Sequence, residues 1–335
     1  MIEVLSASAL ATVQDLGRSG ALRWGVGTSG AMDPLALAAG NLLLGNDEGA
    51  AGIEVPVFPF QVRFTADCAF ACTGADCAAR LDELPLPPWW THEARRGQVL
   101  QLGLPRQDGA WRASRAYLCL AGGIDVPAVL GSRSTQLRGA FGGLDGRALR
   151  RGDTLRAVAP DRGPGVTGFG LVPPALALPL QADGVPAVRV LPAAEYERYS
   201  AASQAAFWSQ PWKITAQSDR YGYRLAGTPL EAMEPIEMHS HGIVPGVIQV
   251  PAGGQPIIQM CDAQPSGGYP KIGTVIEADR WRLGQAPIGS HIRFIETHWD
   301  EAVAALDQTR QWIDEARRLA GLYRGSVRGV DHARR

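Results

Sequence analysis

The sequence has little lysine, few cysteines and almost no net charge. Lys213 and Lys271 are the only lysines among 32 basic residues, and the formal net charge is −1. A chain so close to neutrality is not typical of proteins that bind nucleic acid or an anionic membrane, so we expect neither partner. Five cysteines are too few for a disulfide scaffold and favour a reducing compartment, which predicts a cytoplasmic protein.

Several standard segments and motifs are also missing. The N-terminal residues contain no basic stretch followed by an apolar run, so no signal peptide is expected. No stretch is apolar over the length of a membrane span. The sequence has no P-loop, no His-Glu-x-x-His and no Gly-x-Ser-x-Gly motif, so its chemistry cannot be assigned from a common signature.

Glycine, proline and hydrophobic residues are plentiful. The chain has 335 residues, of which 40 are glycine, 24 are proline and 46% are hydrophobic. That length is enough for two domains of ordinary size. Frequent glycine and proline favour many short strands and turns over long helices. The sequence therefore predicts a mainly β protein with few helices.

Parts of the chain occur twice in the same order. Residues 188–195 resemble residues 2–9, and residues 215–227 resemble residues 12–25. The pattern indicates duplication of one β-rich unit, with a site where the two copies meet. The predicted division is an N-terminal lobe (1–165), a linker (166–186), a C-terminal lobe (187–298), and a terminal helix with a basic tail (299–335).

The stretch 245–271 is the most informative part of the sequence. Alternating residues around 247–249 and 257–259 predict two strands, and a polar, glycine-rich loop follows at 262–273. Glycine allows the backbone to approach a ligand closely. Lys271 in this loop is either an anion ligand or a solvated residue in an arginine-rich chain.

Two further segments are candidate anion sites. Asp33 and Pro34 predict the start of a helix, and Gly45 and Asn46 predict its end. Residues 28–32 lie against the helix N-terminus, where they either bind an anion or simply cap the helix. The stretch 132–135, which contains Arg133, either holds a carboxylate or phosphate or forms a turn.

Charged residues also stand out in glycine-rich or apolar surroundings. His241 alternates with two other ligand-type side chains in 237–241, an arrangement that indicates a metal face, a proton relay or a polar surface. Other charged residues are individually typical of ion pairs, but their recurrence in both predicted copies favours a site. These residues are Asp15, Arg18, Glu54, Asp219, Arg220 and Arg224.

Several longer motifs occur together in this chain. They lie at residues 12–18, 29–33, 121–127, 143–147, 218–225 and 240–251. This set resembles the family of allophanate hydrolase subunit 2, also called biotin-dependent carboxyltransferase-like or urea amidolyase-related, over about residues 2–320. Residues 240–242, 262–264 and 205–212 resemble the branch of this family that contains the C subunit of bacterial 5-oxoprolinase. The chain departs from the family pattern at Pro56, Tyr221 and Pro265.

The resemblance implies a fold and an activity. The implied fold has two cyclophilin-like β-barrel lobes plus a C-terminal helix. The implied activity is ATP-dependent opening of 5-oxo-L-proline to L-glutamate through a phosphorylated intermediate. ATP with magnesium would be held at an atypical site, and no biotin would be attached to this chain. The implied partners are the smaller, cyclophilin-like B subunit and the LamB/YcsF-like A subunit of such an enzyme.

The resemblance and the residue patterns together give a predicted site. For catalysis we predict Lys271, Asp262, Gln264 and Arg133, and for substrate binding Ser29, Gly30, Glu54, Gln249, Gln255, Gly267, Gly268, Tyr269 and His241. Two alternative functions stay open. In the first, the chain is the carboxyltransferase component of a urea-carboxylase or allophanate system. In the second, it is a non-catalytic regulatory antagonist of a kinase inhibitor.

Overall fold

The N-terminal half consists of two antiparallel sheets packed face to face. The computed structural model describes residues 1–8, 10–106, 113–158 and 167–333. One sheet has the order β11 (Thr154–Leu155), β1 (Ile2–Ser6), β4 (Phe60–Phe64), β9 (Val99–Leu102), β6 (Arg80–Leu81) and β7 (Leu84–Pro85). The other has the order β2 (Thr12–Gln14), β3 (Gly52–Val55), β10 (Ala116–Leu120), β5 (Cys68–Gly74) and β8 (Trp90–Ala94).

The inward-facing side chains of both sheets form one core. Val4 and Val62 alternate with more exposed neighbours along their strands, and they pack against Ile53, Phe70 and Leu118 of the other sheet. This alternation is the pattern expected of sheets with one solvated face. The five-stranded sheet is instead buried on both faces, because helix α1 (Pro34–Leu44) covers its second face.

Helix α1 begins and ends where the sequence predicts. The Asp33 side chain accepts a hydrogen bond from the backbone N–H of Ala36, and Pro34 occupies the first helical position. Gly45 follows the helix in the left-handed conformation, with φ of 72°.

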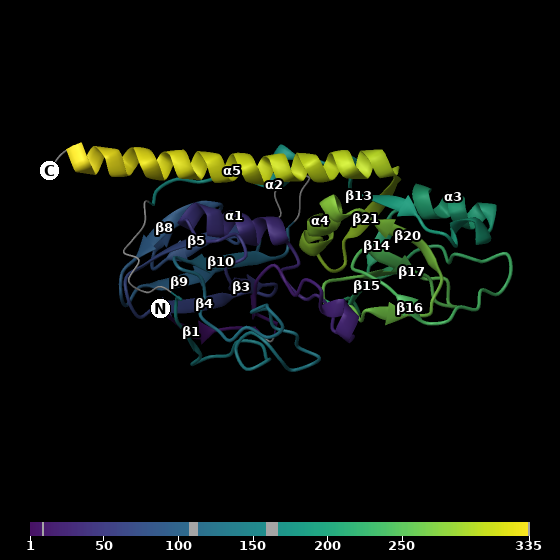
Figure 1. Cartoon of the computed structure of the whole chain (residues 1–335), viewed down its shortest axis with the longest axis horizontal. Helices are drawn as coiled ribbons and strands as arrows, with labels where there is room; N and C mark the ends of the chain where they lie inside the picture. Colours follow the sequence, from purple (N-terminus) through teal and green to yellow (C-terminus); the bar gives the residue numbers. More distant parts are fainter. Residues whose placement is uncertain (9, 107–112, 159–166, 334–335) are drawn as a thin grey trace.

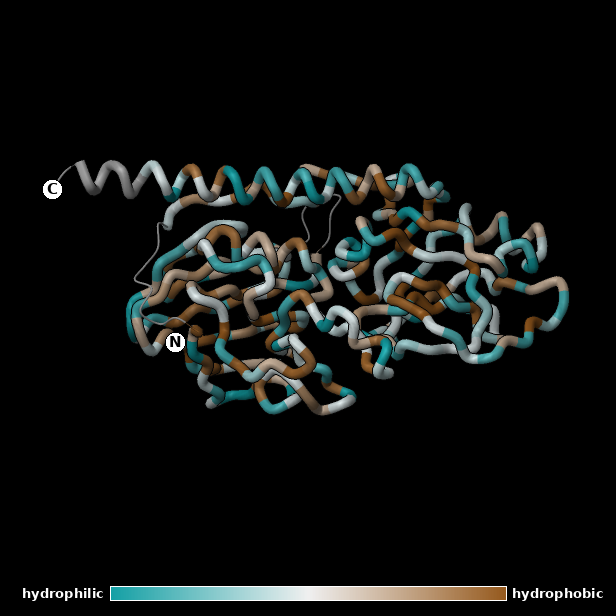
Figure 2. The backbone as a smooth tube through the Cα atoms, in the orientation of Figure 1, coloured by the Kyte–Doolittle hydropathy of each residue, from teal (hydrophilic) through white to brown (hydrophobic). Residues whose placement is uncertain are grey.

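The C-terminal half is a closed barrel of seven strands. Their order is β13 (Val185–Pro192), β20 (Lys271–Val275), β17 (Val247–Gln249), β18 (Ile257–Gln259), β15 (Gly222–Ala226), β14 (Trp212–Ile214) and β21 (His291–Glu296). A parallel pairing of β13 with β21 closes it, and β12 (Gln181–Ala182) extends β13. A separate ribbon joins β16 (His241–Gly242) to β19 (Ser266–Gly267). The buried hydrophobic side chains of these strands form one core cluster. Figure 2 shows hydrophobic backbone segments among the strands of this half.

The remaining helices are short, apart from the last. They are α2 (Pro174–Ala177), α3 (Ala201–Ser209), α4 (Arg280–Gln285) and the 3₁₀ helices η1 (Ala21–Trp24), η2 (Tyr196–Arg198) and η3 (Glu277–Asp279). Helix α5 (Trp299–Ala333) runs along one side of both halves (Figure 1). Among the described residues, none of these helices is both long and apolar enough to cross a membrane.

Helix α5 contacts both halves of the molecule. Ala305 packs on Ile276 of the C-terminal half. Farther along, Tyr323 stacks on Phe169 at 4.6 Å between ring centroids, and Arg324 donates to the carbonyl oxygen of Leu42 at 2.6 Å. The helix therefore holds the two halves in one arrangement.

The predicted mainly β fold with a terminal helix is confirmed. The two predicted strands around 247–249 and 257–259 form an antiparallel pair, as expected. The predicted linker 166–186 contains α2, β12 and the start of β13, and residue 166 lies outside the described residues.

Candidate functional site

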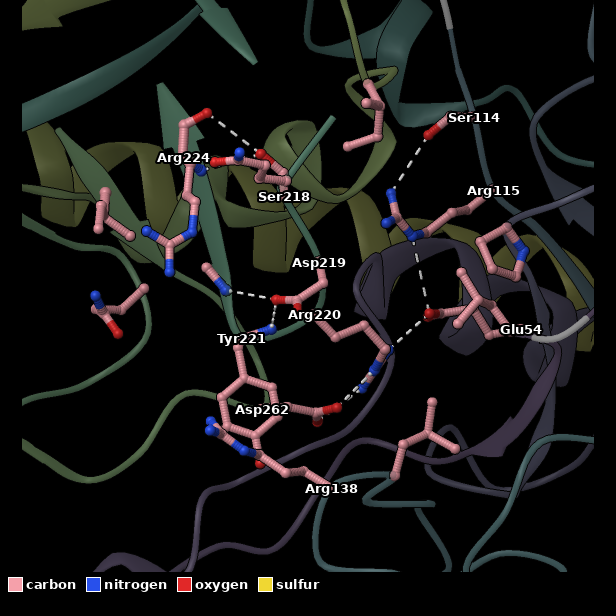
Figure 3. A pocket seen from close by; sticks show the side chains of 18 of the residues that line it. Glu54, Ser114, Arg115, Arg138, Ser218, Asp219, Arg220, Tyr221, Arg224 and Asp262 are labelled. Atoms are coloured by element: carbon pink, nitrogen blue, oxygen red, sulfur yellow. Dashed lines mark hydrogen bonds and ion pairs between the residues drawn. The ribbon is translucent and has the colours of Figure 1, made fainter. Parts of the chain in front are cut away.

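A large cavity lies between the two halves. Its volume is about 940 Å³, and it is lined by side chains of both halves, including Glu54 and Arg115 from the first and Arg220, Tyr221 and Asp262 from the second (Figure 3). Ligand sites commonly occupy such concave junctions and typically measure about 300–1,000 Å³. This cavity, between the two halves, is the candidate functional site.

A buried ion network forms the floor of the cavity. Arg220 Nη1 donates to Glu54 Oε1 at 2.6 Å, while Arg220 Nε and Nη2 donate to the two oxygens of Asp262 at 2.9 and 3.1 Å. Burial disfavours the charged guanidinium, but the Asp262 and Glu54 carboxylates raise the pKa of Arg220 well above its ordinary value. Arg220 is therefore a fixed cation held between two carboxylates.

Glu54 is held in place by its own half of the molecule. It lies on β3 directly opposite Tyr117 of β10, so the two side chains share one face of the sheet. Tyr117 donates its hydroxyl to Glu54 Oε2 at 2.8 Å, and the backbone N–H of Met32 donates to the same oxygen at 2.8 Å. Burial and the Glu54 charge raise the pKa of Tyr117 well above its usual range, so Tyr117 stays protonated as the donor.

Asp262 depends on a close approach of two loops. The backbone N–H of Ser29 donates to the carbonyl oxygen of Cys261 at 2.9 Å, which ties residues 27–30 to 261–263. A Cβ at Gly27 would lie 2.7 Å from the carbonyl oxygen of Ala263, so only glycine fits there. The carbonyl oxygen of Gly30 also accepts from Arg220 Nη2 at 2.6 Å.

Arg115 provides a second buried cation beside Glu54. Its Nη1 donates to the hydroxyl of Tyr223 at 3.0 Å and to the carbonyl oxygen of Gly284 across the interface between the halves. Its Nε lies 3.8 Å from Glu54 Oε1 and has no hydrogen-bond partner among the described residues. The floor of the cavity thus carries an N–H donor whose hydrogen-bonding capacity is not used by the protein.

Sequence comparison agrees with this architecture. Residues 24–296 match the model of a family described as "Carboxyltransferase domain, subdomain A and B". The chain belongs to this family. It is 40% identical over 321 residues to the C subunit of 5-oxoprolinase from Escherichia coli (strain K12), covering 94% of this chain and 97% of that protein. It is 41% identical to the Haemophilus influenzae protein of the same name, covering 95% and 98%.

A solved structure of the family has the same fold. The Kluyveromyces lactis urea amidolyase matches with a TM-score of 0.84 at 28% identity, over 94% of this chain. This chain spans 20% of that amidolyase chain. The family membership predicted from the motifs is therefore confirmed.

Five of the predicted site residues line the cavity of this carboxyltransferase-family chain. They are Glu54, Gln249, Asp262, Gln264 and Tyr269. Gln255 instead lines an adjoining cleft of about 310 Å³, and its amide exchanges hydrogen bonds with the backbone N–H and carbonyl of Gly227. Gly30 reaches the floor only through its carbonyl oxygen.

Lys271 and His241 form a separate cluster with Glu195. The Lys271 Nζ lies 2.8 Å from His241 Nε2 and 3.7 Å from Glu195 Oε2. His241 Nδ1 faces the carbonyl oxygen of His239, which can only accept, so we assign the ring proton to Nδ1. His241 Nε2 is then free to accept from the Lys271 ammonium.

The glycines of the predicted substrate loop shape this second cluster. Gly267 pairs with His241 in the β16–β19 ribbon, and a Cβ on Gly267 would lie 2.7 Å from Gln249 Nε2. A Cβ on Gly268 would lie 3.2 Å from the carbonyl oxygen of Met238. Lys271, His241, Gly267 and Gly268 are not among the residues that line the cavity.

Arg133 and Ser29 lie in buried loop contacts. The backbone N–H of Arg133 donates to the Asp15 carboxylate, and its Nε donates to the carbonyl oxygen of Val126 at 3.0 Å. Ser29 is buried with φ of 53°. Neither residue lines the cavity. Within the described part of the chain, no three histidine, cysteine or acidic side chains are close enough to hold a metal ion.

Some residues of the site were not in the predicted set. Arg115, Tyr117 and Arg138 gave no motif of their own, although Arg115 stands immediately before the buried strand β10, an unusual place for a charge. Arg220 was noted as an embedded charge, but nothing in its surroundings indicated that Glu54 would be its partner.

Proposed function

We infer that this chain is one subunit of an ATP-dependent 5-oxoprolinase, which opens 5-oxo-L-proline to L-glutamate. The observation that carries the proposal is a cavity with a polar, charged floor in a chain that matches two 5-oxoprolinase C subunits over nearly their whole length at 40–41% identity. The proposed partners are the smaller, cyclophilin-like B subunit and the LamB/YcsF-like A subunit of such an enzyme.

The floor of the cavity suits a cyclic amide. A lactam offers one N–H donor and one carbonyl acceptor. The side-chain amides of Gln249 and Gln264 contain an oxygen that can accept from the N–H and an NH₂ group that can donate to the carbonyl. Arg115 Nε, which has no hydrogen-bond partner among the described residues, offers an N–H donor for the substrate carboxylate. Because Glu54 and Asp262 hold Arg220 rigidly, little reorganisation would accompany charge development.

We propose that ATP activates the ring carbonyl. The lactam oxygen attacks the γ-phosphorus, a carbon–oxygen–phosphorus linkage forms, and the bridging phosphorus–oxygen bond breaks with its electron pair leaving on ADP. Water then adds to the activated carbon, the ring carbon–nitrogen bond breaks, and a second water releases phosphate. The products are glutamate, ADP and phosphate. ATP and magnesium are substrates in this scheme, not resident groups.

Lys271 retains a proposed role in this reaction. Its ammonium is held by His241 and Glu195 on the strand that pairs with Gln249, and Gln249 lines the cavity. We propose that Lys271 contributes positive charge beside the substrate loop 262–273, together with Asp262 and Gln264.

The test is reconstitution with the proposed partner proteins. We expect ATP-dependent release of glutamate from 5-oxoproline, and we expect Gln264→Ala to reduce it while the complex still assembles. Assembly without any glutamate release under saturating ATP would overturn the proposal.

A second candidate is the carboxyltransferase component of a urea-carboxylase system. The structural similarity to urea amidolyase, with a TM-score of 0.84, supports this second candidate function. The same preparation would then transfer carbon dioxide from a separately supplied biotinylated carrier to urea, and it would not consume 5-oxoproline.

A further inference from the structure

Two exposed arginines line the cavity away from its buried floor. Arg138 comes from the N-terminal half and Arg224 from β15 of the C-terminal half, and both line the cavity (Figure 3). Among the described residues, neither guanidinium forms an ion pair, whereas Arg220 and Arg115 on the floor both do. Asp219 also lines the cavity, and its carboxylate accepts from the backbone N–H groups of Tyr221 and Gly222. Arg138 and Arg224 therefore keep guanidinium groups that no carboxylate of the described residues engages directly.

Arg138 is held in position by aromatic stacking. Its guanidinium carbon lies 4.8 Å from the centroid of the Tyr221 ring. The Tyr221 hydroxyl in turn accepts from Gln136 Nε2 at 2.7 Å, and Gln136 Oε1 accepts from the backbone N–H of Gly139 at 2.7 Å. This chain of contacts spans both halves of the molecule and lowers the entropy cost of using Arg138 to bind a ligand.

The space around these arginines exceeds the needs of a small lactam. The cavity of about 940 Å³ is at the upper end of ligand sites in general. Arg224 also lines the adjoining cleft of about 310 Å³, so it lies where the two spaces meet. In that cleft the Thr215 hydroxyl has no hydrogen-bond partner among the described residues.

We propose that Arg138 and Arg224 bind the polyphosphate of a nucleoside triphosphate, whose nucleoside end enters the cleft beside Thr215. This inference rests on the proposed ATP dependence and places the nucleotide on this chain. A single substrate carboxylate can engage only one guanidinium closely, whereas a polyphosphate has oxygens along its length for both arginines and enough negative charge to tolerate the nearby Asp219. The planar guanidinium also matches phosphate oxygens in pairs.

The proposal assigns Tyr221 as a positioning residue. Tyr221→Phe removes the hydrogen bond from Gln136 but keeps the ring, so Arg138 remains stacked. Tyr221→Leu removes both. We therefore expect the Leu variant to weaken nucleotide binding more than the Phe variant.

The test uses the assembled complex and measures binding and turnover separately. Calorimetry with ATP, inorganic triphosphate and orthophosphate would be compared for the wild type, Arg138→Gln, Arg224→Gln and the double variant. We expect each single change to weaken ATP and triphosphate binding about tenfold or more, the effect of a lost charged hydrogen bond. Orthophosphate should bind far more weakly throughout, because it engages fewer donors.

Arg23→Gln is the matched control, because Arg23 also stacks on an aromatic ring, at 4.2 Å from Trp24, but does not line the cavity. ATP affinity within twofold of wild type in the double variant would overturn the subsite. A raised KM for 5-oxoproline with unchanged ATP affinity would also overturn it and would assign the arginines to the substrate carboxylate. Arginine-dependent ATP binding without glutamate release would keep the subsite and reject the proposed function.

Discussion

Arg220 and Glu54 join the two halves of the molecule at the floor of the cavity, with 2.6 Å between Nη1 and Oε1 and both side chains largely shielded from water. Arg220 also pairs with Asp262, so one guanidinium serves two carboxylates from different halves. The geometry of the cavity and the packing of the halves therefore depend on the same three side chains.

Replacing Arg220 by Met should strongly destabilise the protein. The change leaves Glu54 and Asp262 buried without their cation, and breaking such a network costs about 3–5 kcal/mol. Denaturant unfolding would measure the loss. Arg63→Met is the control, because Arg63 pairs with Glu3 on the surface, where an ion pair contributes about 0–1 kcal/mol. Equal losses in the two variants would contradict the prediction.

Replacing Gly284 by Ala should disturb the interface between the halves. A Cβ there would lie 2.1 Å from the carbonyl oxygen of Met32, a backbone atom that cannot move aside without shifting the start of helix α1. Overpacking of this kind costs about 1–3 kcal/mol. Gly253→Ala is the matched control, since nothing lies within 4 Å of a Cβ there. The melting temperature of the first variant should fall and that of the second should not.

Asp33 should make stability depend on pH. Burial raises its pKa to about 6, and the nearby Glu54 charge adds to this effect. The unfolded chain releases this proton near pH 4 while the folded chain keeps it to about pH 6, so the free energy of unfolding should decrease as pH rises through that window. The decrease due to Asp33 is at most about 3 kcal/mol and is complete above the folded pKa.

The Asp33→Asn variant isolates this contribution. Asn keeps an oxygen for the backbone N–H of Ala36 but has no proton to release in this range. Denaturant unfolding between about pH 4 and pH 7 should show a smaller decrease with pH than the wild type. An identical pH profile for both proteins would refute the assignment.

Replacing Lys271 by Ala should slow the proposed reaction. A lost charge-stabilising donor typically costs about 2–4 kcal/mol of transition-state stabilisation, and Lys271→Arg should retain most activity because it keeps the charge. Glutamate formation by the assembled complex is the measurement, with unfolding curves to show that the Ala variant is folded. If folded Lys271→Ala works at the wild-type rate, Lys271 has no role in the reaction.

Local patterns in the sequence were sufficient to predict several elements. Helix α1 starts at Asp33–Pro34 and ends at Gly45, and each end is set by interactions among residues within one helical turn. The alternation of apolar and polar residues in 247–249 and 257–259 likewise predicts the two strands that form β17 and β18. Such features are set by short-range sterics and hydrogen bonding, which sequence alone contains.

The pairing of charges in the site could not be predicted in the same way. Glu54 and Arg220 are 166 positions apart, and no periodicity relates them. Arg138 and Tyr221 meet only because the halves pack together. Lys271 was expected beside the substrate because its loop is polar and rich in glycine. Its partner His241 lies in the β16–β19 ribbon, whose two-residue strands leave almost no sequence pattern.

The path of the chain has a consequence for biosynthesis. The chain forms the N-terminal half, crosses to the barrel and then returns along α5, whose Ala320 and Tyr323 cover Leu43 and Phe169 of the first half. Conversely, Met32 of the first half packs in the core of the C-terminal barrel. On the ribosome, the first half therefore keeps an uncovered apolar surface until α5 has been synthesised. A stop codon before α5 would thus expose apolar surface on a half of the molecule whose own residues are all present.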